Sequence, residues 1–324
     1  MESTDDSPVW THAFQTFLSS MDWNAPKFRF HWYLGFDVGD PIYDAPLAFL
    51  TLERKFKTDA LEEFRRQGVP DSALAGLRKD GLTLHVKSYE GMEHAPSYVV
   101  SALIKDAYDD GCDYFYQIND DTNINSPDWA STFTGILLAN PLGSNVGVTG
   151  PTDTNNRRIL THAFVHRTHI DVFGRYFPLA FKNWWSDDWI SNVYGREHTL
   201  RDHPLTITHD VRSHKSDSNN RYTIDYDAQH ALKSELRKGH VQLSKWLKAN
   251  RLPPPMLPMV CGYAPLASDI LTLIQERWDV DHPPSSKDSG DKGRGEGAGG
   301  EGKSGEVSGR RVVLLEPPRP PAAV

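Results

Sequence analysis

Strand and helix patterns alternate along the first half of the chain, and this alternation constrains the fold more than any other feature. Apolar side chains that alternate with polar ones, or run together briefly, predict strands, and apolar residues at helical spacing predict helices. The predicted strands cover 28–36, 82–86 and 114–118, and the predicted helices cover 52–67 and 97–110. Three such alternations favour an α/β fold with a mostly parallel sheet and helices on both faces.

Composition places the end of the predicted domain near residue 280. The chain has 324 residues, and nine of its 24 glycines fall between Asp281 and Arg310, where no aromatic residue occurs. Such a segment cannot bury enough apolar surface to fold. We therefore expect one domain over 1–280 and a disordered tail rich in Gly and Pro over 281–324.

Charge and hydropathy exclude several classes of protein. The formal net charge is −8 and the pI is near 5.9, without a basic stripe, which argues against a nucleic-acid polymer as partner. No run of 18 apolar residues occurs, so the chain as written predicts no membrane span. Cys112 and Cys261 alone cannot build a disulfide framework or a structural zinc site.

Acidic residues follow two of the predicted strands. Asp37 lies in a turn after 28–36, and Asn119-Asp120-Asp121 directly follows 114–118. In parallel sheets, ligands bind beyond the carboxyl ends of the strands. Asp120 and Asp121 can there hold Mg²⁺ or Mn²⁺ and leave its other positions to a diphosphate. A turn or a helix-capping pair is the alternative, since Asp and Asn favour turns.

A second pair of acids lies among tryptophans, in the segment WWSDDW at 184–189. Ser186 is a candidate N-cap, and the helix dipole favours Asp187 and Asp188 in the first turn. Tryptophans beside carboxylates can also stack on a sugar and keep an acid dry. Burial would raise the pKa of the acid and the helix terminus would lower it, so the direction stays open.

Three segments carry a resemblance to a known family. They read YFYQINDDTNINSPDW at 114–129, GVTGPTDTNNRRILTHAFVHRTHIDVFGRYFP at 147–178 and FKNWWSDDWISNVYG at 181–195. The chain here resembles the nucleotide-sugar-dependent glycosyltransferases of the GT-A fold, in particular family 2-like and other inverting types. The resemblance spans roughly Trp10 to Leu247. It implies a GT-A-like, Rossmann-like sheet and transfer of a sugar, from a UDP-sugar as the expected donor, to a hydroxyl of a glycan, protein or lipid acceptor.

The resemblance also implies roles on the donor side. Asn119-Asp120-Asp121 is similar to the Asp-x-Asp element, with Asp121 as metal ligand and Asp120 near the ribose or the metal. Asn119 stands where the family has a leading acid, which leaves the assignment between the two aspartates open. Asp37 is similar to the acid that hydrogen-bonds the nucleotide base, and a turn-forming aspartate before Gly39 is the alternative.

On the acceptor side, the resemblance implies that Asp188 removes the proton of the acceptor hydroxyl and that Asp187 holds an acceptor hydroxyl. The residues expected to line the sugar or the acceptor are Trp184, Trp185 and His166. The implied mechanism is a single displacement with inversion, in which Mn²⁺ or Mg²⁺ on Asp121 neutralises the leaving diphosphate.

Histidines offer further candidate ligands. The resemblance implies a further metal ligand late in the chain, and His209, near the end of a predicted strand at 205–211, is the preferred candidate ahead of His214, with a surface histidine as an equally weighted alternative. Arg212, Lys215 and Arg221 are candidates to close over a diphosphate, and a solvated loop is the simpler interpretation.

Two rival functions remain. His162 and His166 have the spacing of a zinc site on a helix, but the segment between them reads as strand and no His-Glu-x-x-His motif occurs, so a metal-dependent hydrolase is the weaker alternative. The other is a catalytically inactive relative that binds a nucleotide-sugar or a glycan.

The start of the chain departs from the family pattern. Ser7-Pro8 and the apolar residues after them predict a helix, whereas enzymes of this fold begin with a strand. Either the domain is truncated at its N-terminus, so that the sheet lacks this central strand and the nucleotide site lacks a wall, or another segment takes the place of the strand. The compartment stays open too: an upstream anchor would indicate the Golgi or the secretory pathway, and otherwise the cytoplasm.

Overall fold

A computed structural model describes most of the first 252 residues and one later strand. The described residues are 9–21, 28–40, 43–45, 47–70, 72, 74, 81–92, 94–209, 225–252 and, for the backbone, 311–316. All of them belong to one compact unit, formed by Met1–Pro255 and Val307–Val324. They fold as a mixed α/β structure whose sheets contain both parallel and antiparallel strands.

The elements follow the predicted alternation closely. The helices are the π-helix Val9–Phe14, α1 (Gln15–Ser19), α2 (Ala48–Arg66), α4 (Pro96–Asp109), α5 (Trp129–Leu138), α6 (Thr168–Phe173), α7 (Ser186–Asn192), the 3-10 helix Arg196–His198 and α8 (Tyr226–Ala249). The strands are β1 (Arg29–Asp37), β2 (Leu82–Tyr89), β3 (Tyr114–Ile118), β4 (Thr122–Ile124), β5 (Val148–Thr149), β6 (Thr152–Asp153), β7 (Phe164–His166), β8 (Thr199–Leu200), β9 (Thr206–His209) and β10 (Arg311–Glu316). Among the described helices, none has the combined length and apolar character that a membrane crossing requires.

The larger sheet has the strand order β2-β1-β10-β3-β7-β5-β8, and β4, β9 and β6 form a smaller sheet. Within the larger sheet only the pairs β1·β2 and β5·β8 are parallel. The prediction of a mostly parallel sheet is therefore wrong for most neighbouring pairs of strands. The reason is that β10 and β7 run against the other strands, and each makes both of its pairings antiparallel.

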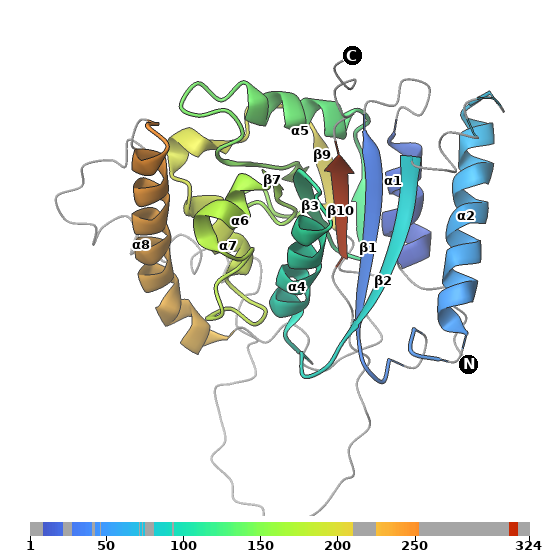
Figure 1. Ribbon diagram of the computed structural model, residues 1–324, viewed down its shortest axis with the longest axis horizontal. Helices are drawn as coiled ribbons and strands as arrows, with labels where there is room; N and C mark the ends of the chain where they lie inside the picture. The colour runs from blue at the N-terminus through green and yellow to red at the C-terminus, as the bar shows by residue number, and fades with distance from the viewer. Residues whose placement is uncertain are drawn as a thin grey trace, which may run out of the picture. The chain divides into compact units, whose positions relative to one another are not determined.

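The strand β10 lies in the middle of this sheet, between β1 and β3 (Figure 1). Arg311 is opposite Leu34 on one side and Ile118 on the other. In a doubly wound sheet with the order 3-2-1-4, this central place belongs to the first strand. A segment from the far end of the sequence thus fills the central position, and it contains the apolar run VVLL typical of a buried strand.

Of the predicted disordered tail, the structure describes only this strand, which differs from the solvated segment expected there. The remaining residues of 281–324 lie outside the described part of the chain.

The two faces of β1 are covered by different helices. Phe30, Trp32 and Leu34 are buried on the face that meets the N-terminal helices, where Phe14 contacts Trp32 with ring centroids 5.3 Å apart. Gly35 points to the other face, where an added Cβ would lie 2.9 Å from both Val99 and Leu103 of α4. Alternation along the strand thus produces the layered arrangement.

The first turn of α4 holds the first turn of α7. The Ser97 amide donates to the carbonyl of Lys182 over 2.9 Å, and the hydroxyls of Ser97 and Ser186 are 3.1 Å apart. Ser186 was the candidate N-cap, but the structure makes it the first residue of α7 and places Trp185 at the N-cap, in the left-handed region at φ 73°. The Ser186 hydroxyl donates to the carbonyl of Asn183 over 3.0 Å, so it does not cap the helix amides.

Candidate functional site

The candidate site lies at the carboxyl edge of the larger sheet. The strands β1 and β3 are both antiparallel to β10, so they run in the same direction and end at the same edge. Asp37 closes β1, and Asn119, Asp120 and Asp121 follow β3. All four side chains are buried, with Asp121 only 2% exposed. The structure therefore places the two acidic positions that the sequence predicted at strand ends along one edge of the sheet, with β10 between β1 and β3.

Asp121 meets His209 at this edge. The Oδ1 atom of Asp121 and the Nε2 atom of His209 are 2.8 Å apart. The contact follows from the register of the smaller sheet, in which Thr122 of β4 is opposite His209 of β9. The Asn119 amide nitrogen lies 3.5 Å from the same ring nitrogen. Two residues predicted separately as metal ligands thus lie in direct contact.

The donor atoms of this pair fit one divalent cation. Neighbouring ligands of an octahedral ion, each at about 2.1 Å, are about 3 Å apart, which matches the Asp121 to His209 separation. A carboxylate oxygen and an imidazole nitrogen are both ligands that Mn²⁺ accepts. Within the described ranges, no set of three or more His, Cys, Asp or Glu side chains has the geometry of a metal site, so these residues would supply two ligands and leave the remaining positions to a diphosphate or water.

A buried polar network lies next to His209. His162 is fully buried, and its ring centroid is 5.6 Å from that of His209. Its Nε2 lies 2.5 Å from the Thr122 hydroxyl, and its Nδ1 lies 2.8 Å from the Thr161 hydroxyl. Since Thr161 donates its only proton to Asp153 over 3.0 Å, its oxygen accepts from Nδ1 of His162. Sequence reasoning missed this network, because its residues lie far apart in the chain.

The other two histidines of this region lie elsewhere. His166 is opposite Tyr114 at the amino end of β3, on the other edge of the sheet from Asp121. His169 is buried between Tyr194 and the carbonyl of Tyr176. Burial lowers the pKa of each imidazole from its ordinary value to about 4.

The structure therefore does not bring His166 to the acids as a sugar-lining residue. Nor does it gather His162, His166 and an acid around a common point, which a metal-dependent hydrolase would need.

Asp187 and Asp188 lie in the first turn of α7, at the same edge of the sheet as Asp121. The helix α4 starts a few residues after β2 ends, and its first turn holds that of α7. A second link runs through Leu160, next to Thr161 in the chain. Its amide donates over 2.7 Å to the Ser191 hydroxyl, which in turn donates to the Asp187 carbonyl over 2.6 Å. The two acidic pairs are thus joined through one short loop.

The sequence left open whether the pKa of Asp188 is raised or lowered, and the structure indicates that it is raised. Its side chain is 8% exposed. Burial and, to a smaller extent, the like charge of Asp187 raise the pKa of the carboxyl to about 7, against a backbone hydrogen bond that lowers it. A carboxyl with a pKa near neutrality is suited to proton transfer.

The tryptophans of this segment have different surroundings. The Trp185 indole is 6% exposed, and its N–H donates to the carbonyl of Asp225 over 2.8 Å, which ties α7 to the start of α8. Trp184 is half-buried and so remains the more accessible of the two predicted sugar-lining residues. His214, Arg212, Lys215 and Arg221 fall in 210–224, outside the described residues.

The chain was compared with protein-family models, with curated protein sequences and with solved structures, and no match was found in any of the three comparisons.

Proposed function

We propose that the chain is a metal-dependent inverting glycosyltransferase that moves a sugar from a nucleotide-sugar, with UDP-sugar as the expected donor, to an acceptor hydroxyl. The observation that carries the proposal is the contact between Asp121 and His209 at the carboxyl edge of β3. Both residues were expected as metal ligands from the resemblance, and they are 88 positions apart in the sequence.

The place of this contact supports a nucleotide ligand. In doubly wound sheets, ligands bind where the strand order reverses, beyond the carboxyl ends of the strands on either side of that point. Here β1 ends at Asp37 and β3 ends before Asn119, with β10 between them. In the proposed complex Asp37 accepts a hydrogen bond from the base, and Asp120 binds the ribose or shares the cation.

A bound Mn²⁺ or Mg²⁺ would supply the positive charge that neutralises the departing diphosphate. The protein would hold it through Asp121 and His209, whose donor atoms already face each other at 2.8 Å. Thr122 and His162 fix the surroundings of His209, as outer-shell partners do in metal sites.

The acceptor reacts on the side of α7. The carboxylate of Asp188 takes the proton of the acceptor hydroxyl as the oxygen forms its bond to the anomeric carbon and the bond to the diphosphate breaks. Asp187 binds a neighbouring acceptor hydroxyl. A single displacement of this kind inverts the anomeric configuration.

The first test is calorimetric titration of the full chain with UDP and with GDP, with and without Mn²⁺. Binding that needs Mn²⁺, that is lost in Asp121→Asn and that survives in the exposed control Asp202→Asn supports the donor site. Nucleotide binding that ignores both Mn²⁺ and Asp121→Asn contradicts it.

The same protein separates an enzyme from an inactive binding relative. Release of UDP from a panel of UDP-sugars in the presence of acceptors supports transfer, provided that Asp188→Asn abolishes turnover and leaves UDP binding unchanged. Metal-dependent binding without any turnover identifies the binding relative instead.

A further inference from the structure

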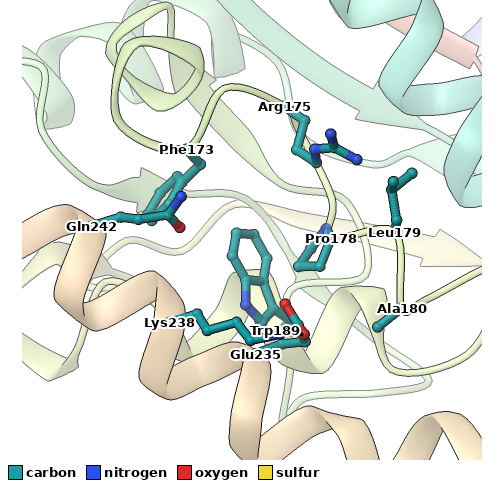
Figure 2. Close-up of a pocket in the computed structure, with 9 residues that line it drawn as sticks. All are labelled: Phe173, Arg175, Pro178, Leu179, Ala180, Trp189, Glu235, Lys238 and Gln242. Carbon is teal, nitrogen blue, oxygen red and sulfur yellow. Dashed lines mark hydrogen bonds and ion pairs between the residues drawn. The ribbon is translucent and has the colours of Figure 1, made fainter.

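The cavity beside α7 has few groups that could bind a polar ligand or a cation. Its volume is about 290 Å³, and it lies between the loop after α6 and one face of α8 (Figure 2). Glu235 is the one carboxylate among the described residues that line it, and it forms an ion pair with Lys238 over 2.6 Å. Two histidines on β1 and β2 are better placed to bind a ligand.

His31 of β1 and His85 of β2 meet on one face of the larger sheet. The strand β2 is the last one in this sheet (Figure 1). In the parallel register His31 is opposite Thr83 and Tyr33 is opposite His85, so the two histidines are diagonal neighbours. The Nδ1 atom of His31 lies 3.0 Å from the Nε2 atom of His85. Both side chains are half-buried, so both keep contact with solvent.

Stacking and a hydrogen bond hold the ring of His85 in place. This ring lies against the ring of Tyr33, with the centroids 4.1 Å apart and the planes within 8° of parallel. Tyr33 is itself fully buried, and its hydroxyl donates to the carboxylate of Asp110. The ring of His31 is inclined by 25° to that of His85. The two imidazoles are therefore positioned before a ligand arrives, which reduces the entropic cost of binding.

The charges around the pair favour a cation. Lys87, two positions after His85 in β2, forms an ion pair with Asp106 over 3.5 Å. The negative charge of Asp110 acts on His85. Burial, followed by the neighbouring His31, lowers the pKa of His85 to about 4, so its ring is neutral at pH 7. A neutral imidazole has a nitrogen lone pair that it can give to a metal ion.

The distance between the two nitrogen atoms favours one kind of metal geometry. With metal–nitrogen bonds of about 2.0 Å, a separation of 3.0 Å corresponds to an angle of about 95° at the metal. This is close to the right angle of square-planar and tetragonal sites, which Cu²⁺ and Ni²⁺ adopt, whereas tetrahedral Zn²⁺ would need a separation of about 3.3 Å. Of these ions, Cu²⁺ binds nitrogen ligands most tightly.

We infer that His31 and His85 form a binding site for Cu²⁺, with Nδ1 of His31 and Nε2 of His85 as ligands and water in the remaining positions. In the free protein one proton lies between these two nitrogens. On binding, this proton moves through solvent to the other nitrogen of its own ring, so that each neutral ring presents one lone pair to the metal. The inference does not depend on glycosyl transfer, because neither histidine belongs to the proposed donor site or to its base.

The test is electron paramagnetic resonance of the full chain with Cu²⁺ below one molar equivalent. We expect a tetragonal Cu²⁺ signal whose spin-echo modulation comes from two imidazoles. Competition with glycine measures the affinity. His31→Gln and His85→Gln should each weaken Cu²⁺ binding at least about tenfold and leave at most one imidazole in the signal. Two controls should change the affinity less than about twofold: His230→Gln, an exposed histidine of α8, and His209→Gln in the proposed donor site.

Two results would overturn the inference: fewer than two imidazoles in the signal of the wild-type protein, or unchanged affinity in His31→Gln and His85→Gln. An equal loss in His209→Gln would place the Cu²⁺ at the proposed donor site instead, and an equal loss in His230→Gln would indicate binding by scattered surface histidines. Thermal unfolding adds a second measurement. Cu²⁺ should raise the unfolding midpoint of the wild-type protein and not that of the two variants, whose midpoints without metal show that they are folded.

Discussion

The two acidic pairs at the carboxyl edge differ in what stands beside them. Asp121 faces the imidazole of His209 at 2.8 Å, whereas Asp188 has the like charge of Asp187 as its neighbour. A basic partner favours the ionised form of a carboxyl, which can bind a cation. An acidic neighbour favours the protonated form. We propose that the first pair binds a cation and that the second transfers a proton.

Different structural elements position Asp121 and Asp188. Asp121 is fixed by the antiparallel register of β4 and β9, and Asp188 is fixed by the first turn of a short helix. The two supports are different elements joined through the Leu160 and Ser191 contact. Each pair can therefore be changed without rebuilding the other.

The largest expected effect is on turnover. Asp188→Asn should lower the rate of sugar transfer by about 10²–10⁴-fold, the range that a general base contributes, with nucleotide affinity unchanged. In the wild type the rate should rise about tenfold per pH unit up to about pH 7 and then level off, since the carboxyl must be ionised. Steady-state kinetics from pH 5 to 9 measures both. A flat profile, or full activity in the variant, would show that another group takes the proton.

The next effect is on stability. Asp188→Asn should raise stability, whereas it should lower turnover. Between pH 4 and 7 the unfolded chain loses the Asp188 proton that the folded chain keeps, so stability falls as the pH rises through this window. Asp188→Asn removes the cost and should raise the free energy of unfolding by about 2–4 kcal/mol at pH 8 and leave it unchanged at pH 4. Urea denaturation at the two pH values measures it. A variant that is less stable at pH 8 would contradict the buried, uncompensated carboxyl.

The cation-binding pair predicts a smaller effect with a different signature. His209→Gln should reduce Mn²⁺-dependent nucleotide affinity by about tenfold or more and leave the metal-independent part unchanged. His230→Gln, an exposed histidine of α8, is the matched control. Calorimetry at several Mn²⁺ concentrations separates the two parts, and a loss that does not depend on metal would remove His209 from the role.

The smallest effect on nucleotide affinity concerns the network next to His209. Thr161→Val deletes the hydroxyl between Asp153 and His162 and leaves a buried carboxylate oxygen without this donor. We expect a loss of about 1–3 kcal/mol in stability and only a few-fold loss in nucleotide affinity. Ser234→Ala on α8 serves as the surface comparison. An unchanged unfolding midpoint would show that the network is not rigid.

Local patterns predicted the elements that carry the candidate site. The strand expected at 114–118 is β3 with the same bounds, and the acids after it lie where strand periodicity placed them. His209 was also placed at the end of a strand. These features depend on neighbours in the sequence, which a periodic pattern records.

Features that depend on distant segments were not predictable. His166 lies on the wrong edge for a sugar-lining role because β7 runs antiparallel to β3, and residue spacing does not encode direction. The network of Thr122, Asp153, Thr161 and His162 forms only when three separate segments meet. The strand at 311–316 follows a glycine-rich stretch, whose composition predicts disorder. Its six residues do not by themselves indicate which strands they pair with.

The central place of β10 has a consequence for biosynthesis. Nearly two hundred positions separate Arg311 from Ile118, its partner in β3, so β3 and β1 leave the ribosome long before the strand that joins them. Until then each presents an unpaired edge, the feature that invites wrong pairing between chains. The central pairings of this sheet therefore need a contact between distant segments, a kind of contact that slows folding.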